Sequence, residues 1–311
     1  MTNKTLRVVS ISGGKDSLAC ALIALQRFPR DEIRFVTADT GNEHELTMEY
    51  LTDYLPGALG LPIHTVRADF TRLIAGKAKF VTEKWPGMGI SQDKIDRALS
   101  VLTPTGSPFL DLCIWKGRFP SRMAQFCTTE LKSVPLNRYQ LELIDEGYHV
   151  ESWQGVRRDE SRNRANAKRR EVLTDDLSVY RPIVDWAAFQ VINYVRSRGF
   201  KLNPLYSQGM GRVGCMPCIN ANKRELAEID RRFPEHIERI SEWESIVQEA
   251  SKRGGATFIP SLGEGTPAEL MAKGNITQVI KWAKTTRGGK NYDLLSSGEP
   301  EMCASEYGLC E

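Results

Sequence analysis

The chain has 311 residues, of which 41% are hydrophobic and 26% charged, so it can bury the core of one large domain or of one domain with an extension. Its formal net charge of +3 is too small to require a nucleic-acid partner, and it does not exclude one. No apolar run approaches the roughly 20 residues of a membrane-spanning helix, and the N-terminal residues lack the layout of a signal peptide, so we expect a cytoplasmic protein with no membrane partner.

Short apolar runs rich in β-branched residues alternate with helical patterns in the first part of the chain. The runs that predict buried strands are residues 6–11, 33–38, 63–68 and 149–155. The intervening patterns that predict helices are residues 18–28 and 43–55. Because strands alternate with helices, we expect an α/β fold with a doubly wound parallel sheet, whose ligands bind beyond the carboxyl ends of the strands.

The remaining segments differ in character from this alternating pattern. Residues 71–120 contain glycine and proline punctuation and predict an insertion or lid. A helix is expected over residues 186–198, with Asp185 as its N-cap. Further helices are expected at residues 223–232, 234–252 and 276–284. We therefore expect an α/β nucleotide-binding domain over residues 1–220 and a mainly helical extension with a cysteine-containing tail over residues 221–311.

The first predicted strand is followed by a glycine-containing polar loop. It consists of Ser12, Gly13, Gly14, Lys15, Asp16 and Ser17. Two glycines let the backbone approach an anion closely, and the next helix directs its N-terminal amides at the same point. Lys15 would add a charge for phosphate. Since the spacing is not that of a Walker A loop, the segment predicts a phosphate-binding site of another type, or a purely structural turn.

Two more polar segments follow predicted strands. The second strand ends in Asp39, Thr40, Gly41, Asn42 and Glu43. These acids either bind a nucleotide and its Mg²⁺ or simply end the strand and cap the next helix. After the fourth strand and Gly155, residues 157–170 carry seven Lys and Arg in fourteen positions. This run, which begins with Arg157 and Arg158, is either a solvated loop or a phosphate-binding loop.

The seven cysteines form an odd set, which in a cytoplasmic chain favours metal or redox chemistry over a disulfide framework. Cys215 and Cys218 make a Cys-x-x-Cys motif, which suits zinc, an iron–sulfur cluster or a redox pair. Cys20 and Cys113 lie in apolar segments and are expected to be buried thiols. The histidines show no ligand spacing and are assigned no function; they are His44, His64, His149 and His236.

Taken in order, these segments resemble the PP-loop superfamily of ATP pyrophosphatases and phosphoadenosine phosphosulfate (PAPS) reductases. SGGKDS resembles the PP-loop of ATP pyrophosphatases, which cleave ATP between the α and β phosphates, and DTGNE resembles their adenine-nucleotide segment. WQGVRRDESRNR resembles the arginine-bearing segment of sulfonucleotide reductases, and residues 180–218 resemble that family's stretch leading to its cluster Cys-x-x-Cys. The motif set is most similar to the iron–sulfur ATP pyrophosphatases of DNA phosphorothioation (Dnd and Ssp type).

The resemblance implies an adenine nucleotide alpha hydrolase-like fold that binds ATP and Mg²⁺. The residues expected to bind the nucleotide are Ser12, Gly13, Gly14, Lys15, Asp16, Ser17, Asp39, Thr40, Gly41, Glu43 and Gly155. The residues expected to act in catalysis are Lys15, Asp16, Arg157, Arg158 and Cys310.

The resemblance also implies a [4Fe–4S] cluster. Cys127 lies in a segment similar to the family's double-cysteine segment, although Phe126 replaces the second cysteine. With the Cys-x-x-Cys pair this gives three ligands, and Cys303 is slightly preferred over Cys310 as the fourth. The reverse assignment stays open. In the reductases a C-terminal Glu-Cys-Gly-Leu-His carries the nucleophilic cysteine, and here Tyr307 stands in its place.

Several functions agree with these features. The preferred one is an ATP pyrophosphatase that adenylates a substrate for sulfur transfer, with DNA or RNA as candidate acceptor and a cysteine desulfurase as candidate sulfur donor. The intact Lys-Asp-Ser of the loop and the displaced tail nucleophile favour it over the alternative, a PAPS or adenosine phosphosulfate (APS) reductase. A tRNA thiolation enzyme and a zinc-holding nucleic-acid-binding module are further alternatives.

Overall fold

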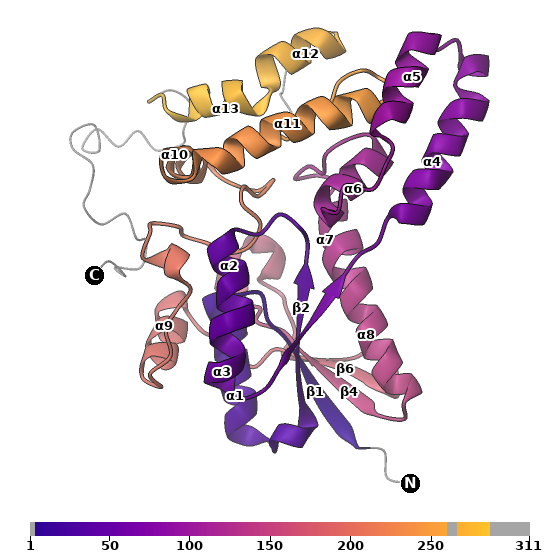
Figure 1. Ribbon diagram of the computed structural model, residues 1–311. Coiled ribbons are helices and arrows are strands. Elements are labelled where there is room, and N and C mark those ends of the chain that lie inside the picture. Colours follow the sequence, from indigo (N-terminus) through magenta and orange to yellow (C-terminus); the bar gives the residue numbers. More distant parts are fainter. Residues whose placement is uncertain (1–3, 260–265, 287–311) are drawn as a thin grey trace.

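The computed structural model describes residues 4–259 and 266–286, which form an α/β lobe and a helical lobe (Figure 1). The six-stranded sheet has the order β3-β2-β1-β4-β6-β5. Its strands are β1 (Thr5–Ser10), β2 (Ile33–Asp39), β3 (Ile63–Arg67), β4 (His149–Trp153), β5 (Arg170–Val172) and β6 (Leu177–Tyr180). The expected α/β fold is confirmed. The strand order reverses between β1 and β4, at the position where such sheets bind their ligands.

The sheet is parallel, as expected, except for one antiparallel pairing at its edge. The first four strands and β6 are parallel, but β5 pairs antiparallel with β6, with Arg170 opposite Tyr180. Arg170 belongs to the basic run, where no strand was expected. A short edge strand that is exposed on one side needs no continuous apolar run, so its pattern gave no signal.

Helices cover both faces of the sheet. One face carries α1 (Lys15–Arg27), the continuous helix formed by α2 (Glu45–Glu49), a π-helical turn (Tyr50–Tyr54) and α3 (Leu55–Leu59), and α9 (Ala188–Arg196). The other face carries α8 (Val134–Asp145), which is preceded by α7 (Phe126–Thr128) and a second π-helical turn (Thr129–Ser133). Neighbouring residues of β1 serve the two faces, since Val8 packs with the α8 side and Val9 with the α1 side.

The helical lobe combines two parts of the chain that are far apart in sequence (Figure 1). Its helices are α4 (Thr71–Lys84), α5 (Gln92–Val101), α6 (Pro108–Lys116), α10 (Lys223–Arg232), α11 (Pro234–Ala250), α12 (Pro267–Gly274) and α13 (Ile276–Ala283). One hydrophobic core joins both parts, with Phe109 of α6 stacked on Trp243 of α11 at 5.7 Å between ring centroids. The segment expected to be an insertion or lid is therefore helical and packs with the C-terminal helices.

The expected boundaries of the four later helices agree with the structure to within two residues, but the expected N-cap of α9 is wrong. That helix begins at Ala188, with Ala187 in the capping position, and not at Trp186 after an Asp185 cap. Asp185 is engaged in ion pairs with Arg158 and Arg169 instead. Among the described helices, none combines the length and the apolar character needed to cross a membrane.

Candidate functional site

The PP-loop is shaped by the hydroxyl of Ser17, which lies in the first turn of α1. Ser17 Oγ accepts the backbone N–H of Ser12 at 3.1 Å and donates to the carbonyl of Gly14 at 2.9 Å. Gly13 has a φ of +75°, and a Cβ there would lie 2.9 Å from Thr47 Cγ2. Only glycine meets both demands. The loop therefore brings the N-terminal end of α1 to the carboxyl end of β1, as an anion site requires.

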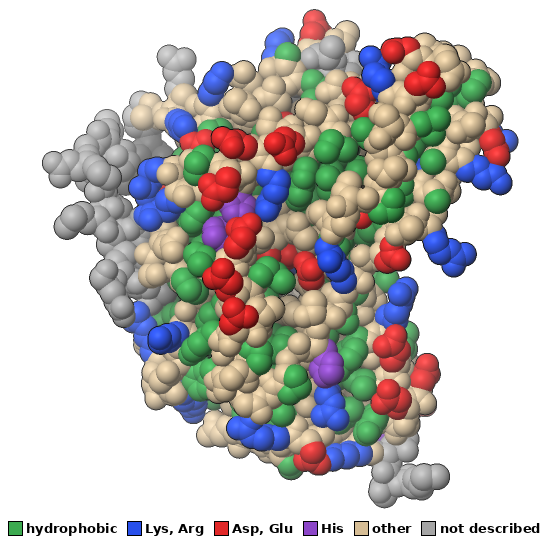
Figure 2. Space-filling model, viewed as in Figure 1, with side chains coloured by type: hydrophobic (Ala, Val, Ile, Leu, Met, Phe, Trp, Pro, Cys, Tyr) green, Lys and Arg blue, Asp and Glu red, His purple; other side chains and the backbone are tan. Residues whose placement is uncertain are grey.

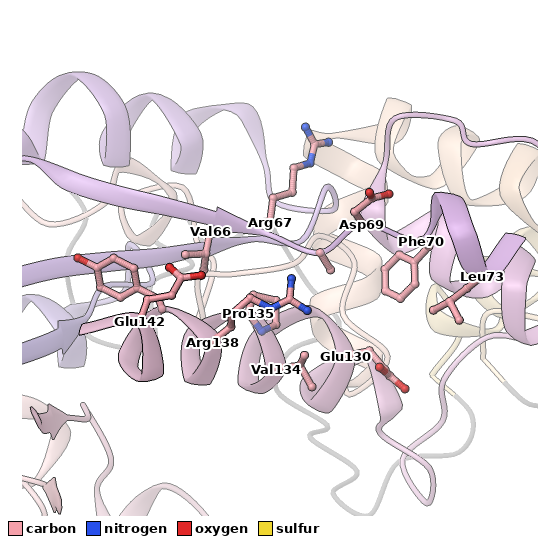
Figure 3. Close-up of a pocket in the computed structure, with 12 residues that line it drawn as sticks. Val66, Arg67, Asp69, Phe70, Leu73, Glu130, Val134, Pro135, Arg138 and Glu142 are labelled. Carbon is pink, nitrogen blue, oxygen red and sulfur yellow. The ribbon is translucent and has the colours of Figure 1, made fainter. Parts of the chain in front are cut away.

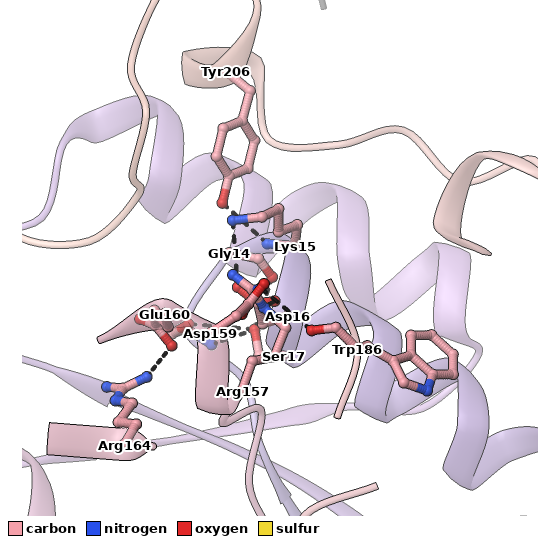
Figure 4. A network of polar contacts seen from close by, with 11 residues as sticks. Gly14, Lys15, Asp16, Ser17, Arg157, Asp159, Glu160, Arg164, Trp186 and Tyr206 are labelled. Atoms are coloured by element: carbon pink, nitrogen blue, oxygen red, sulfur yellow. Dashed lines mark hydrogen bonds and ion pairs between the residues drawn. The ribbon is translucent and has the colours of Figure 1, made fainter. Parts of the chain in front are cut away.

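Lys15 is held at the start of α1 by Tyr206, a residue that the sequence analysis did not single out. The backbone N–H of Lys15 donates to Tyr206 Oη at 3.1 Å, and Lys15 Nζ lies 5.5 Å from the centre of the tyrosine ring (Figure 4). Lys15 and Tyr206 are buried, with exposed fractions of 5% and 2%. Tyr206 belongs to residues 180–218, which carried the family resemblance, so that stretch also supplies part of the PP-loop's surroundings.

Arg157 meets the PP-loop through Asp16. Its Nε donates to Asp16 Oδ1 at 2.5 Å, and its Nη1 pairs with Asp159 (Figure 4). Burial of the Arg157 side chain acts to lower its pKa, but the charge and hydrogen bond of Asp16, together with the charges of Asp159 and Glu160, outweigh burial and raise the pKa. Gly155 permits this approach, because a Cβ there would lie 2.8 Å from the backbone of Asp16 and Ser17. The predicted residues Gly155 and Arg157 thus lie at the loop.

Arg158 points away from the PP-loop, although it is next to Arg157 in sequence. Its Nη1 pairs with Asp185, and its Nε donates to the carbonyl of Ala167 at 3.0 Å. Other arginines of the basic run also have acidic partners: Arg164 with Glu160, Arg169 with Asp185, and Arg170 with Glu151. Much of the run's charge is therefore balanced within the protein, and the catalytic role expected for Arg158 stays a prediction.

The segment after β2 is tied to the Cys-x-x-Cys loop. Thr40 Oγ1 donates to Glu43 Oε1 at 2.7 Å and lies 3.4 Å from Cys215 Sγ. Cys215 Sγ also lies 3.7 Å from Glu43 Oε1, and the backbones of Glu43 and Cys215 form an antiparallel bridge. Thr40 and Glu43, predicted to bind the nucleotide, therefore contact the sulfur site directly.

Two further residues strengthen the link between these loops. Asn42 is buried, and its amide donates to the carbonyl of Pro217 at 3.0 Å. Arg239 of α11 donates from Nη2 to Asn42 Oδ1 at 3.0 Å and to the carbonyl of Met216 at 2.8 Å. The helical lobe thus holds both loops together. Asp39 turns the other way, accepting the N–H of Gly41 at 2.8 Å and lying 3.5 Å from Arg67 Nε.

Cys127, Cys215 and Cys218 are half-buried on neighbouring segments. Burial raises the pKa of Cys215 to about 12, and the nearby Lys132 opposes this rise. The thiolate of Cys215 in turn raises the pKa of Lys132, whose positive charge also acts to lower the pKa of Cys127. A bound metal would lower the pKa of Cys215 instead, because a coordinating thiol loses its proton. The positive charge of Lys132 suits a metal cluster held by anionic thiolates.

The arrangement of these sulfurs bears on which metal centre they fit. A tetrahedral zinc site with Zn–S bonds of about 2.3 Å would hold its sulfurs about 3.8 Å apart. Within the described part of the chain, the three cysteines do not form a group whose ligand atoms all lie within 4.8 Å of one another. A multi-iron cluster, which binds one thiolate at each iron, needs wider spacing between its sulfur ligands.

Cys303 and Cys310, the expected tail ligand and thiol, lie outside the described residues. Cys20 and Cys113 are fully buried, as expected.

The described residues that do form such a group are His44, Glu45 and His236. No function was predicted for these histidines from the sequence, because 192 positions separate them and no spacing rule links them. A groove between β3 and α8, of about 290 Å³, is lined by residues such as Arg67, Phe70 and Arg138 (Figure 3). It contains none of the predicted site residues.

Residues 7–221 match the phosphoadenosine phosphosulfate reductase domain. The chain belongs to this family. It is 47% identical, over 99% of its own length and 97% of the relative's, to a 37.8 kDa protein of Escherichia phage 186. A protein of Methanocaldococcus jannaschii is 28% identical over 83% of this chain, which spans 43% of that protein.

Reductases of phosphosulfate nucleotides are among the more distant relatives. The phosphoadenosine 5'-phosphosulfate reductase of Escherichia coli O1:K1 is 32% identical over 33% of this chain and 40% of the enzyme. A phosphate complex of the PAPS reductase of Candida auris superposes with a TM-score of 0.43 and 15% identity, over 68% of this chain and 82% of that one. The family match makes the chain a PP-loop superfamily enzyme related to the sulfonucleotide reductases.

Proposed function

We propose that this protein is a PP-loop ATP pyrophosphatase that adenylates an acceptor for sulfur transfer. ATP with Mg²⁺ would bind at the carboxyl end of β1, with its phosphates on the PP-loop and the N-terminus of α1. An acceptor oxygen would attack the α-phosphorus and expel pyrophosphate, and a sulfur nucleophile would then displace AMP. The protein's contribution to the first step is positioning and charge stabilisation.

The residues of the PP-loop support this assignment of roles. Lys15, whose Nζ lies 3.4 Å from Asp16 Oδ2, supplies a positive charge beside the helix N-terminus. Asp16 is held by Arg157, so its carboxylate is fixed and not free to swing into solvent. Such fixed charges cost little reorganisation when charge develops on the phosphates. Arg157 either stays on Asp16 or turns to a phosphate when the nucleotide binds.

The contact between Cys215 and Thr40 carries the proposal that sulfur chemistry accompanies nucleotide chemistry. The sulfur lies 3.4 Å from the hydroxyl of a residue that begins the nucleotide segment after β2. Cys127, Cys215 and Cys218, with one tail cysteine, would hold a [4Fe–4S] cluster beside the positive charge of Lys132. When bound, the cluster would supply redox chemistry or a sulfur-binding iron next to the adenylated acceptor. DNA or RNA is the proposed acceptor class, and a cysteine desulfurase the proposed sulfur donor.

A sulfonucleotide reductase is the second candidate, because the family match and the E. coli relative favour it. The two functions separate cleanly in one experiment with the full chain purified without oxygen. Its rate of AMP formation from radiolabelled ATP with Mg²⁺ is compared with its rate of sulfite release from PAPS or APS in the presence of reductant. We expect AMP formation and no sulfite. Sulfite release without ATP cleavage would replace the first function by the second.

A further inference from the structure

His44 and His236 come together from opposite lobes of the molecule. His44 is the N-cap of α2 in the α/β lobe, and His236 lies in the first turn of α11 in the helical lobe. Their rings stack with centroids 4.7 Å apart and planes inclined by 27°. Both side chains are buried, with exposed fractions of 5% for His44 and 1% for His236.

The hydrogen bonding of this histidine pair is incomplete. His44 Nδ1 accepts the N–H of Leu46 at 3.0 Å and so caps α2. His44 Nε2 and both ring nitrogens of His236 are buried and lack a partner with hydrogen-bond geometry. Buried polar groups are normally paired, and leaving them unpaired is costly. The unpaired Nε2 of His236, which faces the carboxylate of Glu45, therefore points to a ligand held at this place.

Glu45 completes the group. Its Oε2 lies 3.1 Å from His236 Nε2 and 3.6 Å from His44 Nδ1, and the three ligand atoms lie within 4.8 Å of one another. A tetrahedral metal with bonds of about 2.0–2.1 Å to nitrogen and oxygen separates its ligand atoms by about 3.3–3.4 Å. The two measured separations bracket this value. Two imidazoles and one carboxylate are also the ligands of catalytic zinc sites that keep a fourth position open.

The surroundings add negative charge. On the face shown in Figure 2, histidine and several acidic side chains gather in the region where Figure 1 places α2 and α11. Besides Glu45, the acids Glu49 and Glu235 act electrostatically on His44. Arg239 opposes them, with its Nη1 3.9 Å from Glu45 Oε1, but it is one cation against three carboxylates. Around His44 the carboxylates therefore outnumber the cation, whereas at His236 the charge of Arg239 acts more strongly than that of Glu45.

We propose that His44, Glu45 and His236 bind a divalent metal ion of the zinc class, at a site separate from the cysteines. The Leu46 amide would yield the lone pair of His44 Nδ1 to the metal, and Glu45, with a side chain 65% exposed, would leave a coordination position open to solvent. The ion would tie α2 to α11 and thereby fix the helical lobe over the segment that follows β2. This proposal does not depend on the proposed enzymatic function.

Co²⁺ is the best probe, because its visible spectrum distinguishes nitrogen and oxygen ligands from thiolates. The full chain, freed of metal with a chelator, is titrated with Co²⁺ without oxygen. We expect tetrahedral d–d bands from one ion that appear without thiolate charge-transfer absorption. Zn²⁺ should displace the Co²⁺ and raise the thermal unfolding midpoint, because binding to the folded state alone stabilises it.

Matched variants test the ligands without disturbing the core. Glu45→Gln removes the exposed carboxylate and should weaken Co²⁺ binding at least tenfold. Glu49→Gln, one turn further along the same helical segment, makes the same charge change outside the group and should change the affinity less than twofold. His149→Ala removes a histidine paired with Asp176 at 2.7 Å and controls for binding at surface pairs. Equal affinities for the two glutamine variants, or thiolate-type absorption alone, would overturn the site.

Discussion

Asp16 and Arg157 form a partly buried ion pair that joins the PP-loop to the loop after β4, with 2.5 Å between Asp16 Oδ1 and Arg157 Nε. The two residues are separated by 141 positions in sequence. Their contact lies between β1 and β4, where the strand order reverses. The structure therefore distinguishes Arg157, which serves the PP-loop, from Arg158, which serves Asp185.

This distinction predicts different outcomes for two neighbouring substitutions. Arg157→Gln should lower kcat/KM for the nucleotide at least tenfold, or about 1.4 kcal/mol of transition-state stabilisation, because it leaves Asp16 without its partner. Arg158→Gln should change kcat/KM less than threefold. Steady-state kinetics of both variants, with circular dichroism to confirm folding, provide the measurement. Equal losses would show that the basic run acts as a unit on the substrate.

Gly155 should tolerate no side chain. Gly155→Ala places a Cβ 2.8 Å from the backbone of Asp16 and Ser17, where no flexible side chain can move aside. We expect a loss of stability of roughly 1–3 kcal/mol, typical of overpacking, together with weaker nucleotide binding. Gly147→Ala, just before β4 begins, is the control, because nothing lies within 4 Å of the Cβ position of Gly147. Its φ of +92° adds some backbone strain. Denaturant unfolding of both variants decides whether the close approach matters.

The cysteine site should hold iron through specific residues. Anaerobic purification should give about four irons per chain, as a [4Fe–4S] cluster requires. Cys215→Ser should lose most of this iron, whereas Cys20→Ala, which alters a buried thiol of α1, should keep it. One of Cys303→Ser and Cys310→Ser should lose iron and the other should not. A wild-type protein that contains zinc and no iron would contradict the assignment.

Glu244 should make stability depend on pH. This carboxylate is buried and accepts the backbone N–H groups of Phe258 at 2.7 Å and Ile276 at 2.9 Å. Burial raises its pKa to about 7, and the two hydrogen bonds only partly oppose the rise. Because the folded protein then binds the proton more tightly than the unfolded chain, the free energy of unfolding should fall as pH rises from about 4.5 to about 7.

The effect of Glu244 is isolated by comparison with Glu244→Gln, which cannot titrate. The pH-dependent part should be on the order of 3 kcal/mol across this interval and absent from the variant. Chemical denaturation at several pH values measures how the free energy of unfolding changes with pH in the wild type and in the variant. Parallel curves for wild type and variant would mean that the carboxyl keeps an ordinary pKa in the folded protein.

The local motifs were readable from the sequence because each sits within one strand–loop–helix unit. SGGKDS and DTGNE lie where alternating strands and helices place them, and Cys215 and Cys218 are adjacent by their spacing. Contacts between distant segments were not readable in this way. The stacking of His44 on His236 and the hydroxyl of Tyr206 on the Lys15 amide depend on how the lobes pack. The edge strand β5 lacked an apolar pattern because its exposed side needs none.

The proposed ATP pyrophosphatase activity is tested most directly by the position at which ATP is cleaved. The full chain is incubated with Mg²⁺ and candidate DNA or RNA acceptors, in parallel reactions with ATP labelled at the α-phosphate or at the γ-phosphate, and the labelled products are separated. Wild type should give AMP and an equal amount of pyrophosphate, and Lys15→Ala should give neither while keeping its fold. ADP and inorganic phosphate as products, or wild-type rates in Lys15→Ala, would contradict the proposal.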